Sequence, residues 1–186
     1  MYSGGMDDRS DPASLGADDL ASWAALATVL EWLPPALDAD LVEAFDLTHF
    51  EYGVLFALAD APDRALDMST LAGYANSSLS RLSRAVSRLE KRGWIRRTRS
   101  HSDRRSTLAA LTEEGMEIFH RAAPVHTETV KNLVLDPLTK AQRRQLHEIS
   151  LRIQRAIRGE EGWQPDGDDR GPSPDRSGRQ TDGGPS

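Results

Sequence analysis

One stretch of the chain changes its hydrophobic period in a way that few folds can accommodate. Over residues 79–92, apolar side chains recur at the spacing of one face of an α-helix. Gly93 follows at the position where the end of a helix favours glycine. Residues 94–99 and 106–111 then read as two short strands joined by a polar turn. The chain is therefore expected to fold around a helix that runs directly into a β hairpin.

Helical patterns occupy most of the chain before this stretch. Apolar residues over 20–30 share one helical face, and Pro34 and Pro35 are expected to kink or restart that helix. Thr48 and Glu51 have the spacing of a capping box, in which each side chain bonds the other residue's backbone N–H. This spacing predicts that a second helix begins at Thr48.

Shorter elements are predicted to connect the second helix to the hairpin stretch. Residues 66–68 fit a very short strand, and Ser69 is placed to cap a short helix over 70–75. Asn76 tolerates the left-handed backbone that a tight turn requires. Ser78 is then expected to cap the helix over 79–92.

The chain after the hairpin again has helical patterns. Thr112 is expected to cap a long helix that Pro124 bends. Asp136 and Pro137 should end that helix, and Thr139 should begin the last one. The predicted fold is mostly α with a small β hairpin.

The net charge of −6 is distributed very unevenly along the chain. Residues 1–19 and 159–186 each carry a local charge of −4, whereas residues 81–105 hold ten Lys and Arg against two acidic residues, a local +8. The segments 1–16 and 159–186 are expected to be disordered acidic tails, because they have too little apolar surface to offset the entropy of ordering. The basic segment thus lies inside the predicted ordered core, and the acidic segments lie at the two ends of the chain.

Several classes of protein are disfavoured by composition. The chain has no cysteine, which excludes disulfides and thiolate sites. No unbroken apolar run approaches the length of a membrane span, and the N-terminal segment lacks the basic and apolar regions of a secretory signal. A cytoplasmic protein without membrane association is expected. The five histidines lack zinc-site spacing and no nucleotide-binding or hydrolase motif occurs, so we expect no metal, no cofactor, no catalytic residues and no enzymatic activity.

The helix over 79–92 has a polar face of unusual composition. Leu82, Ala85, Val86 and Leu89 point inward, which leaves the outward positions to serine and arginine: Ser80, Arg81, Ser83, Arg84, Ser87 and Arg88. An ordinary solvated face mixes both signs of charge, but here no outward acid occurs before Glu90. Arginine can bond guanine through two hydrogen bonds and serine can contact bases or phosphates. The pattern predicts a winged helix-turn-helix core that places this helix in the major groove of DNA.

Two motifs of this chain resemble the MarR (multiple antibiotic resistance regulator) family. The first is the run over 71–95, which contains the turn, the basic helix and the start of the hairpin. The second is the run from Asp103 to Gly115, which matches the wing signature of the family in length and spacing. The resemblance covers about residues 20–158.

The resemblance implies a homodimeric transcriptional regulator, usually a repressor, which a small molecule often releases from DNA. Its domains would be dimerisation helices at 17–46 and 113–158 around a DNA-binding unit at 47–112. The family pattern places these residues on double-stranded DNA: Ser78, Ser80, Arg81, Ser83 and Arg84 at the major groove or its flanking phosphates, Arg88 near a phosphate, and Arg105 in the minor groove, oriented by Asp103.

Two questions remain open at the level of sequence. The aromatic residues of the first two helices could line an effector pocket or could belong to the core or a dimer interface; the pocket candidates are Trp23, His49, Tyr52 and Phe56. The alternatives to a sequence-specific repressor are a sequence-tolerant DNA-coating protein and a winged-helix module that binds an acidic protein. The terminal helices have wide apolar faces, which favours a homodimer.

Overall fold

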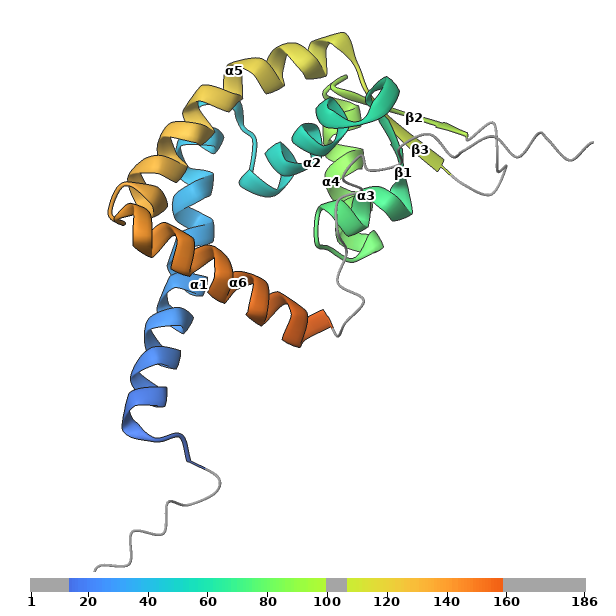
Figure 1. Ribbon diagram of the computed structural model, residues 1–186. Helices are drawn as coiled ribbons and strands as arrows, with labels where there is room; N and C mark the ends of the chain where they lie inside the picture. Colours follow the sequence, from blue (N-terminus) through green and yellow to red (C-terminus); the bar gives the residue numbers. More distant parts are fainter. Residues whose placement is uncertain (1–13, 100–106, 159–186) are drawn as a thin grey trace, which may run out of the picture.

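The computed structural model of the chain describes residues 14–99 and 107–158. Figure 1 shows long helices at the two ends of the described chain, with the short helices and a small sheet gathered beside them. The helices are α1 (Ala17–Phe45), α2 (His49–Asp60), η1 (Pro62–Arg64), α3 (Met68–Tyr74), α4 (Leu79–Lys91), α5 (Glu113–Val130), the π-helical turn η2 (Lys131–Leu135) and α6 (Lys140–Arg158). The strands are β1 (Ala65–Asp67), β2 (Ile95–Arg99) and β3 (Thr107–Leu111). The prediction of a mostly α fold with a small β hairpin is confirmed.

Three predicted helix caps, at Thr48, Ser78 and Thr112, are present in the structure. The Thr48 side chain accepts a hydrogen bond from the Glu51 N–H while the Glu51 carboxylate accepts from the Thr48 N–H, which completes the capping box. The Ser78 and Thr112 hydroxyls likewise accept bonds from backbone N–H groups in the first turns of α4 and α5. Asn76 adopts a left-handed backbone with φ of 48°, as predicted for the turn between α3 and α4. These contacts span only a few residues and therefore follow from local sequence.

Two local predictions were wrong. Pro34 and Pro35 do not break the first helix, since α1 is continuous from Ala17 to Phe45. The backbone carbonyls that the prolines leave without donors lie in an exposed stretch of α1, where water can bond them. Pro124 lies inside α5, and the bend predicted there stays a prediction. Helix α3 begins at Met68, with Asp67 rather than Ser69 at its N-cap.

The sheet has three strands, one more than the hairpin alone supplies. Strands β2 and β3 pair antiparallel as predicted, and β1 pairs with the other edge of β3, so the order is β1-β3-β2. Ala65 lies opposite Ala110 in this pairing. The strand before the two short helices is thereby attached to the hairpin that follows them, which closes the winged helix-turn-helix unit.

The core lies under α2, between the sheet and the helices α3, α4 and α5. Its fully buried side chains come from every one of these elements: Leu55 and Leu58 of α2, Leu71 of α3, Leu82, Val86 and Leu89 of α4, Ile95 of β2, Ala109 of β3 and Ala122 of α5. Only the C-terminal part of α1 joins the core, where Leu37 and Leu41 are buried. The buried set includes the inward face predicted for α4.

The rest of α1 and all of α6 remain outside this core. No residue of α6 over 140–157 is buried, and even the apolar side chains of Ile149 and Ile153 are exposed. The N-terminal half of α1 extends away from the other helices in Figure 1 and exposes Trp23 and Leu30. By length and composition α1 could also cross a membrane, a property that it shares with some helices of soluble proteins. The sequence shows no unbroken apolar run there because Glu31 interrupts it.

Candidate nucleic-acid interface

Helix α4 presents a hollowed polar face to solvent. The hollow has a volume of about 870 Å³ and is lined by Ser80, Ser83, Arg84, Ser87, Arg88 and Lys91. No carboxylate belongs to this lining. The opposite face of α4 is buried against the core, so the basic face of the helix is the one that solvent can reach. This arrangement suits a polyanion that approaches α4 along its length.

The arginines on this face differ in what already holds them. The Arg84 side chain is exposed and has no hydrogen-bond or ion-pair partner among the described residues. The Arg81 guanidinium lies over the Phe50 ring of α2, 4.2 Å from the ring centroid. Arg88 bonds Asp46 and Glu51, which lie outside α4. Arg84 is therefore the arginine most free to reach a ligand in this groove.

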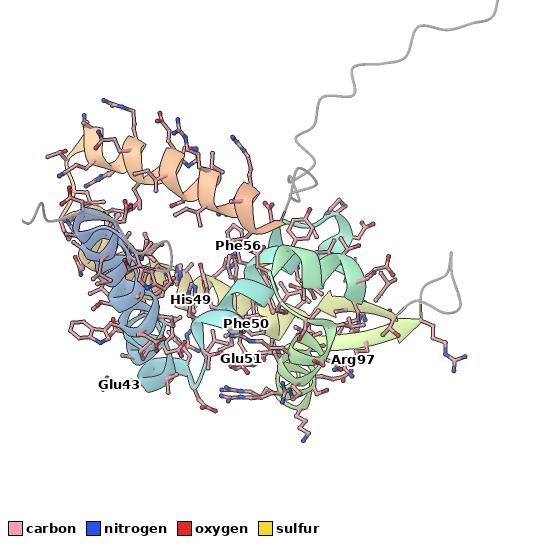
Figure 2. The ribbon with its side chains drawn as sticks, turned by 90° about the horizontal axis from the view of Figure 1, so that it is seen from below. Glu43, His49, Phe50, Glu51, Phe56 and Arg97 are labelled. Atoms are coloured by element: carbon pink, nitrogen blue, oxygen red, sulfur yellow. The ribbon has the colours of Figure 1, made fainter. Side chains whose placement is uncertain are left out.

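Strand β2 supports the α4 face through Arg97. The Arg97 Nη2 donates to the Ser83 carbonyl oxygen at 2.8 Å and to the Ser87 hydroxyl at 2.6 Å. Its backbone N–H donates to the Glu90 carboxylate at 3.0 Å. Figure 2 shows Arg97 beside α4. Alternation along a strand places Arg96 and Arg97 on opposite faces, but it does not show which of the two folds onto a helix.

The wing carries the remaining predicted DNA contacts. Arg96 and Arg99 of β2 are exposed at the hairpin. Asp103 and Arg105 lie outside the described residues, so their roles stay predictions. At the other end of the site, the Ser78 and Ser80 hydroxyl oxygens are 3.1 Å apart at the first turn of α4.

Rings from α2 and α5 form a stacked cluster where these two helices pack together. His49 Nδ1 and His126 Nε2 are 3.1 Å apart, and the Tyr52 ring stacks on His126 with the centroids separated by 4.2 Å. Phe119 contacts both Tyr52 and Phe56 through its ring. Three of the four residues proposed for a pocket thus share this cluster. The sequence did not indicate His126 or Phe119, because nothing local shows that α5 packs on α2.

The fourth pocket residue lies elsewhere. Trp23 is exposed in the N-terminal half of α1, about six helical turns from the end of that helix. The described cavity beside the cluster has a volume of about 370 Å³ and is lined instead by Pro34, Asp38, Thr48, His49, Phe50, Glu51, Arg81, Arg84, Ala85 and Arg88. It joins the C-terminal part of α1 and the start of α2 to α4. Figure 2 shows His49, Phe50 and Glu51 along the first turn of α2, between α1 and α4.

Burial shifts the protonation of the ring cluster. Desolvation lowers the pKa of His49 below 6.5, and the nearby Asp38 carboxylate only partly opposes this shift. Desolvation also lowers the pKa of His126, and the charge of His49 lowers it further. Burial raises the pKa of Tyr52. The neutral form of both histidines is therefore favoured in the folded chain.

The free energy of unfolding is expected to fall when the pH drops below about 6.5, the ordinary pKa of histidine. Both histidine pKa values are lower in the folded chain, so the unfolded chain binds more protons in this range and stability rises with pH. The His126→Phe variant keeps a ring in the stack and removes one titrating group. Urea unfolding at pH 7.5 and 5.5 should show a smaller loss for His126→Phe than for the unaltered chain. Equal pH dependence of His126→Phe and the unaltered chain would contradict this account.

Metal binding has no structural support in the described part of the chain. No group of three or more His, Asp or Glu side chains there could hold a metal ion.

Comparisons with known proteins place this arrangement among DNA-binding regulators. A family model described as the MarR family matches residues 47–107. The fold is similar to that of Sco3205 of Streptomyces coelicolor, a MarR family transcriptional regulator solved in complex with DNA. The TM-score is 0.78 and the identity 38%, over 82% of this chain and 96% of Sco3205.

Two curated regulators are also similar in sequence. The HTH-type transcriptional regulator PecS of Dickeya dadantii is 26% identical over 151 residues, which cover 80% of this chain and 89% of PecS. The transcriptional repressor MprA of Escherichia coli is 27% identical over 113 residues, 61% of this chain and 64% of MprA. The match to Sco3205 covers nearly the whole of that protein at an identity that is informative about family.

Proposed function

The chain belongs to the MarR family and is a transcriptional regulator that binds DNA, and on that premise we propose a homodimeric repressor that recognises a pseudo-palindromic operator. The observation that carries the proposal is the exposed groove of α4, which is lined by serine and basic side chains without a carboxylate. Repression is the usual role that the family resemblance implies, and the similarity to the repressor MprA supports it. A cytoplasmic location follows from this role.

The proposed DNA contacts divide by the groove they enter. Ser78, Ser80, Arg81, Ser83 and Arg84 lie on or near the exposed face of α4 and are assigned to the major groove or its flanking phosphates. Arg105 is assigned to the minor groove, where the narrow groove attracts arginine, with Asp103 orienting it. The predicted phosphate contact of Arg88 competes with a second role, because Arg88 already bonds Asp46 and Glu51.

The proposed dimer uses the helices that the core leaves uncovered. Apolar side chains are exposed along both terminal helices, among them Leu20, Trp23, Leu30, Ile149 and Ile153. A second copy that covers them would remove this surface from water, which is a favourable change. The segments 17–46 and 113–158 are accordingly proposed as dimerisation helices. A two-fold axis between two copies of α4 requires half-sites about 10 base pairs apart.

A small-molecule effector is proposed to bind between the dimerisation helices and α4. The 370 Å³ cavity in that position has apolar side chains at Pro34, Phe50 and Ala85, and the rest of its lining is polar or charged, three arginines included. Its size is within the range of small-molecule sites, about 300–1,000 Å³. His49 lines this cavity, whereas Tyr52 and Phe56 belong to the ring cluster. Trp23 would reach such a site only from a partner's α1.

Duplex selection followed by salt titration tests the proposed function. The full chain is mixed with a randomised duplex pool, and the retained sequences should share two inverted half-sites. Affinity for the selected duplex should fall steeply between about 50 and 200 mM salt, because bound phosphates release counterions. Sedimentation should give two chains per duplex.

The alternatives predict different results in the same experiment. A DNA-coating protein would retain the pool without a preferred sequence. A protein-interaction module would bind no duplex even at low salt. One chain per duplex would contradict the homodimer while leaving sequence recognition in place.

A further inference from the structure

The junction between α1 and α4 is held by two arginines, Arg88 of α4 and Arg92 at the C-cap of that helix. Arg88 and Arg92 are four residues apart, so their side chains leave the same face of the helix. The Arg88 Nη2 donates to the Asp46 carbonyl oxygen at 2.7 Å and to the Asp46 carboxylate at 3.0 Å. The Arg92 Nη1 donates to the same two groups, and its Nη2 donates to the Phe45 carbonyl oxygen at 2.8 Å. Both arginines therefore bind the last residues of α1.

The end of α1 is shaped to receive these cations. Asp46 has a left-handed backbone with φ of 51°, and its N–H bonds the Val42 carbonyl while the Leu47 N–H bonds the Leu41 carbonyl. This geometry ends the helix and leaves the last carbonyls pointing outward without N–H donors from the helix. The negative end of the helix dipole and the Asp46 carboxylate then lie side by side. A guanidinium satisfies both.

A buried carboxylate attaches α2 to the same junction. The Glu51 side chain is 5% exposed, and its Oε1 is 3.2 Å from the Arg88 Nε. Its other oxygen accepts bonds from the Thr48 N–H and hydroxyl. A buried charge of this kind is costly without a cation beside it. Arg88 thus contacts α1 and α2 from α4 at once.

Arg92 is restrained a second time. Its guanidinium lies over the Trp94 ring, 3.7 Å from the ring centroid, and its side chain is 28% exposed. To reach a phosphate, Arg92 would have to leave both the ring and Asp46. The position of Arg92 near the basic groove is therefore not sufficient to make it a DNA contact.

We propose that Arg88 and Arg92 are positioning residues that lock α4 to the C-terminal end of α1 through Asp46. The proposal rests on the proposed dimer and its operator. If α1 pairs with a partner's helices, a fixed angle between α1 and α4 sets the distance and rotation between the two copies of α4. A one-base-pair change in half-site spacing rotates the half-sites by about 35° relative to each other, which a rigid pair of helices cannot follow.

Neutralising Asp46 tests this proposal by the sign of its effect. Asp46→Asn keeps a residue that tolerates the left-handed backbone and removes one negative charge near the basic groove. If charge alone governed binding, the variant would bind the selected operator more tightly. If Asp46 locks α4, we expect roughly fivefold weaker binding and a flatter dependence on half-site spacing. The measurement is binding of the full chain to duplexes whose half-site spacing varies by one base pair in each direction.

Glu43 supplies a matched control. It lies on the last turns of α1 (Figure 2), is exposed, and has no hydrogen-bond or ion-pair partner among the described residues. Glu43→Gln removes the same charge from the same helix and should leave the spacing preference unchanged. If Glu43→Gln and Asp46→Asn have the same effect, the lock is overturned.

Arg92→Lys separates position from charge. Lysine keeps the positive charge but cannot bond the Phe45 carbonyl and the Asp46 carboxylate together as a guanidinium does. The variant should lose the spacing preference, as Asp46→Asn does. Unchanged binding by Arg92→Lys would contradict the proposal.

Thermal unfolding of each variant distinguishes the lock from simple destabilisation. A variant that is only less stable would lose affinity by the same factor for duplexes of every half-site spacing. That result would also overturn the lock. Absence of duplex binding by the unaltered chain would overturn the proposed function itself, so the two failures are distinguishable.

Discussion

Replacing Gly115 with alanine is expected to lower the free energy of unfolding by about 3 kcal/mol, the upper end of the usual cost of overpacking. A Cβ at this position would overlap the Trp94 carbonyl oxygen and lie 2.7 Å from the Leu111 Cδ1. The carbonyl cannot move aside cheaply, because it accepts a bond from the Thr112 N–H at the start of α5. For a chain of this size the melting temperature should fall by roughly 6–12 °C.

Gly53→Ala is the matched control for this prediction. Gly53 also lies inside a helix, but an added Cβ meets no atom within 4 Å. Because alanine restricts the unfolded chain, Gly53→Ala should stabilise the protein by about 0.5–1 kcal/mol. Both variants are compared by urea and thermal unfolding at one protein concentration, since a dimer's stability depends on concentration. A change below about 0.5 kcal/mol for Gly115→Ala, the range of an ordinary surface substitution, would show that the packing around Trp94 yields.

Arg84→Ala is expected to weaken binding to the selected operator by about 1–3 kcal/mol and to relax specificity at one base-pair position. Arg84 has no partner to lose within the described chain, so the folded structure should be unaffected. The guanidinium can bond guanine at two acceptors, which alanine cannot replace. The measurement is affinity for a set of duplexes in which each operator position is changed in turn.

Two further variants separate base reading from charge. Arg84→Lys keeps the charge but not the paired bonds, so it should lose the position-specific preference with a nearly unchanged salt dependence. Arg96→Ala, at an exposed position of β2, should weaken all duplexes alike and reduce the salt slope by about 1. A uniform loss for Arg84→Ala on every sequence would favour the DNA-coating protein.

The family resemblance and the shape of α4 were accessible from sequence because they depend on local patterns. The inward set that begins at Leu82 is buried as the helical period required, and Gly93 adopts the positive φ of 78° that ends the helix. The glycine of the wing signature, Gly115, also has a structural reason, although only the packing against Trp94 shows it. A motif can thus indicate that a glycine matters before the structure shows which contact requires it.

The prolines of α1 show that local sequence alone overestimates how strongly a proline interrupts a helix. Pro34 and Pro35 each remove a helix donor, which is a real cost, but α1 continues through them. Their neighbours are exposed to water at the carbonyls left without donors, and Leu37 and Leu41 hold the following turns against the core. Packing of the following turns against the core offsets the lost hydrogen bonds, and the local sequence pattern contains no information about that packing.

The sequence by itself determined several features made within a few residues: the capping box at Thr48, the caps at Ser78 and Thr112, the turn at Asn76, and the buried and basic faces of α4. Tertiary structure alone decided which charges on that outer face are free. Arg88 meets Asp46 across 42 residues, Arg97 meets Ser83 across 14, and His49 meets His126 across 77. Helical and strand periods repeat over two to four residues, so they contain no information about partners at these distances. Arg84 and Arg88 look alike in the sequence. Only the fold shows that Arg84 is exposed to solvent and that Arg88 bonds Asp46 at the end of α1.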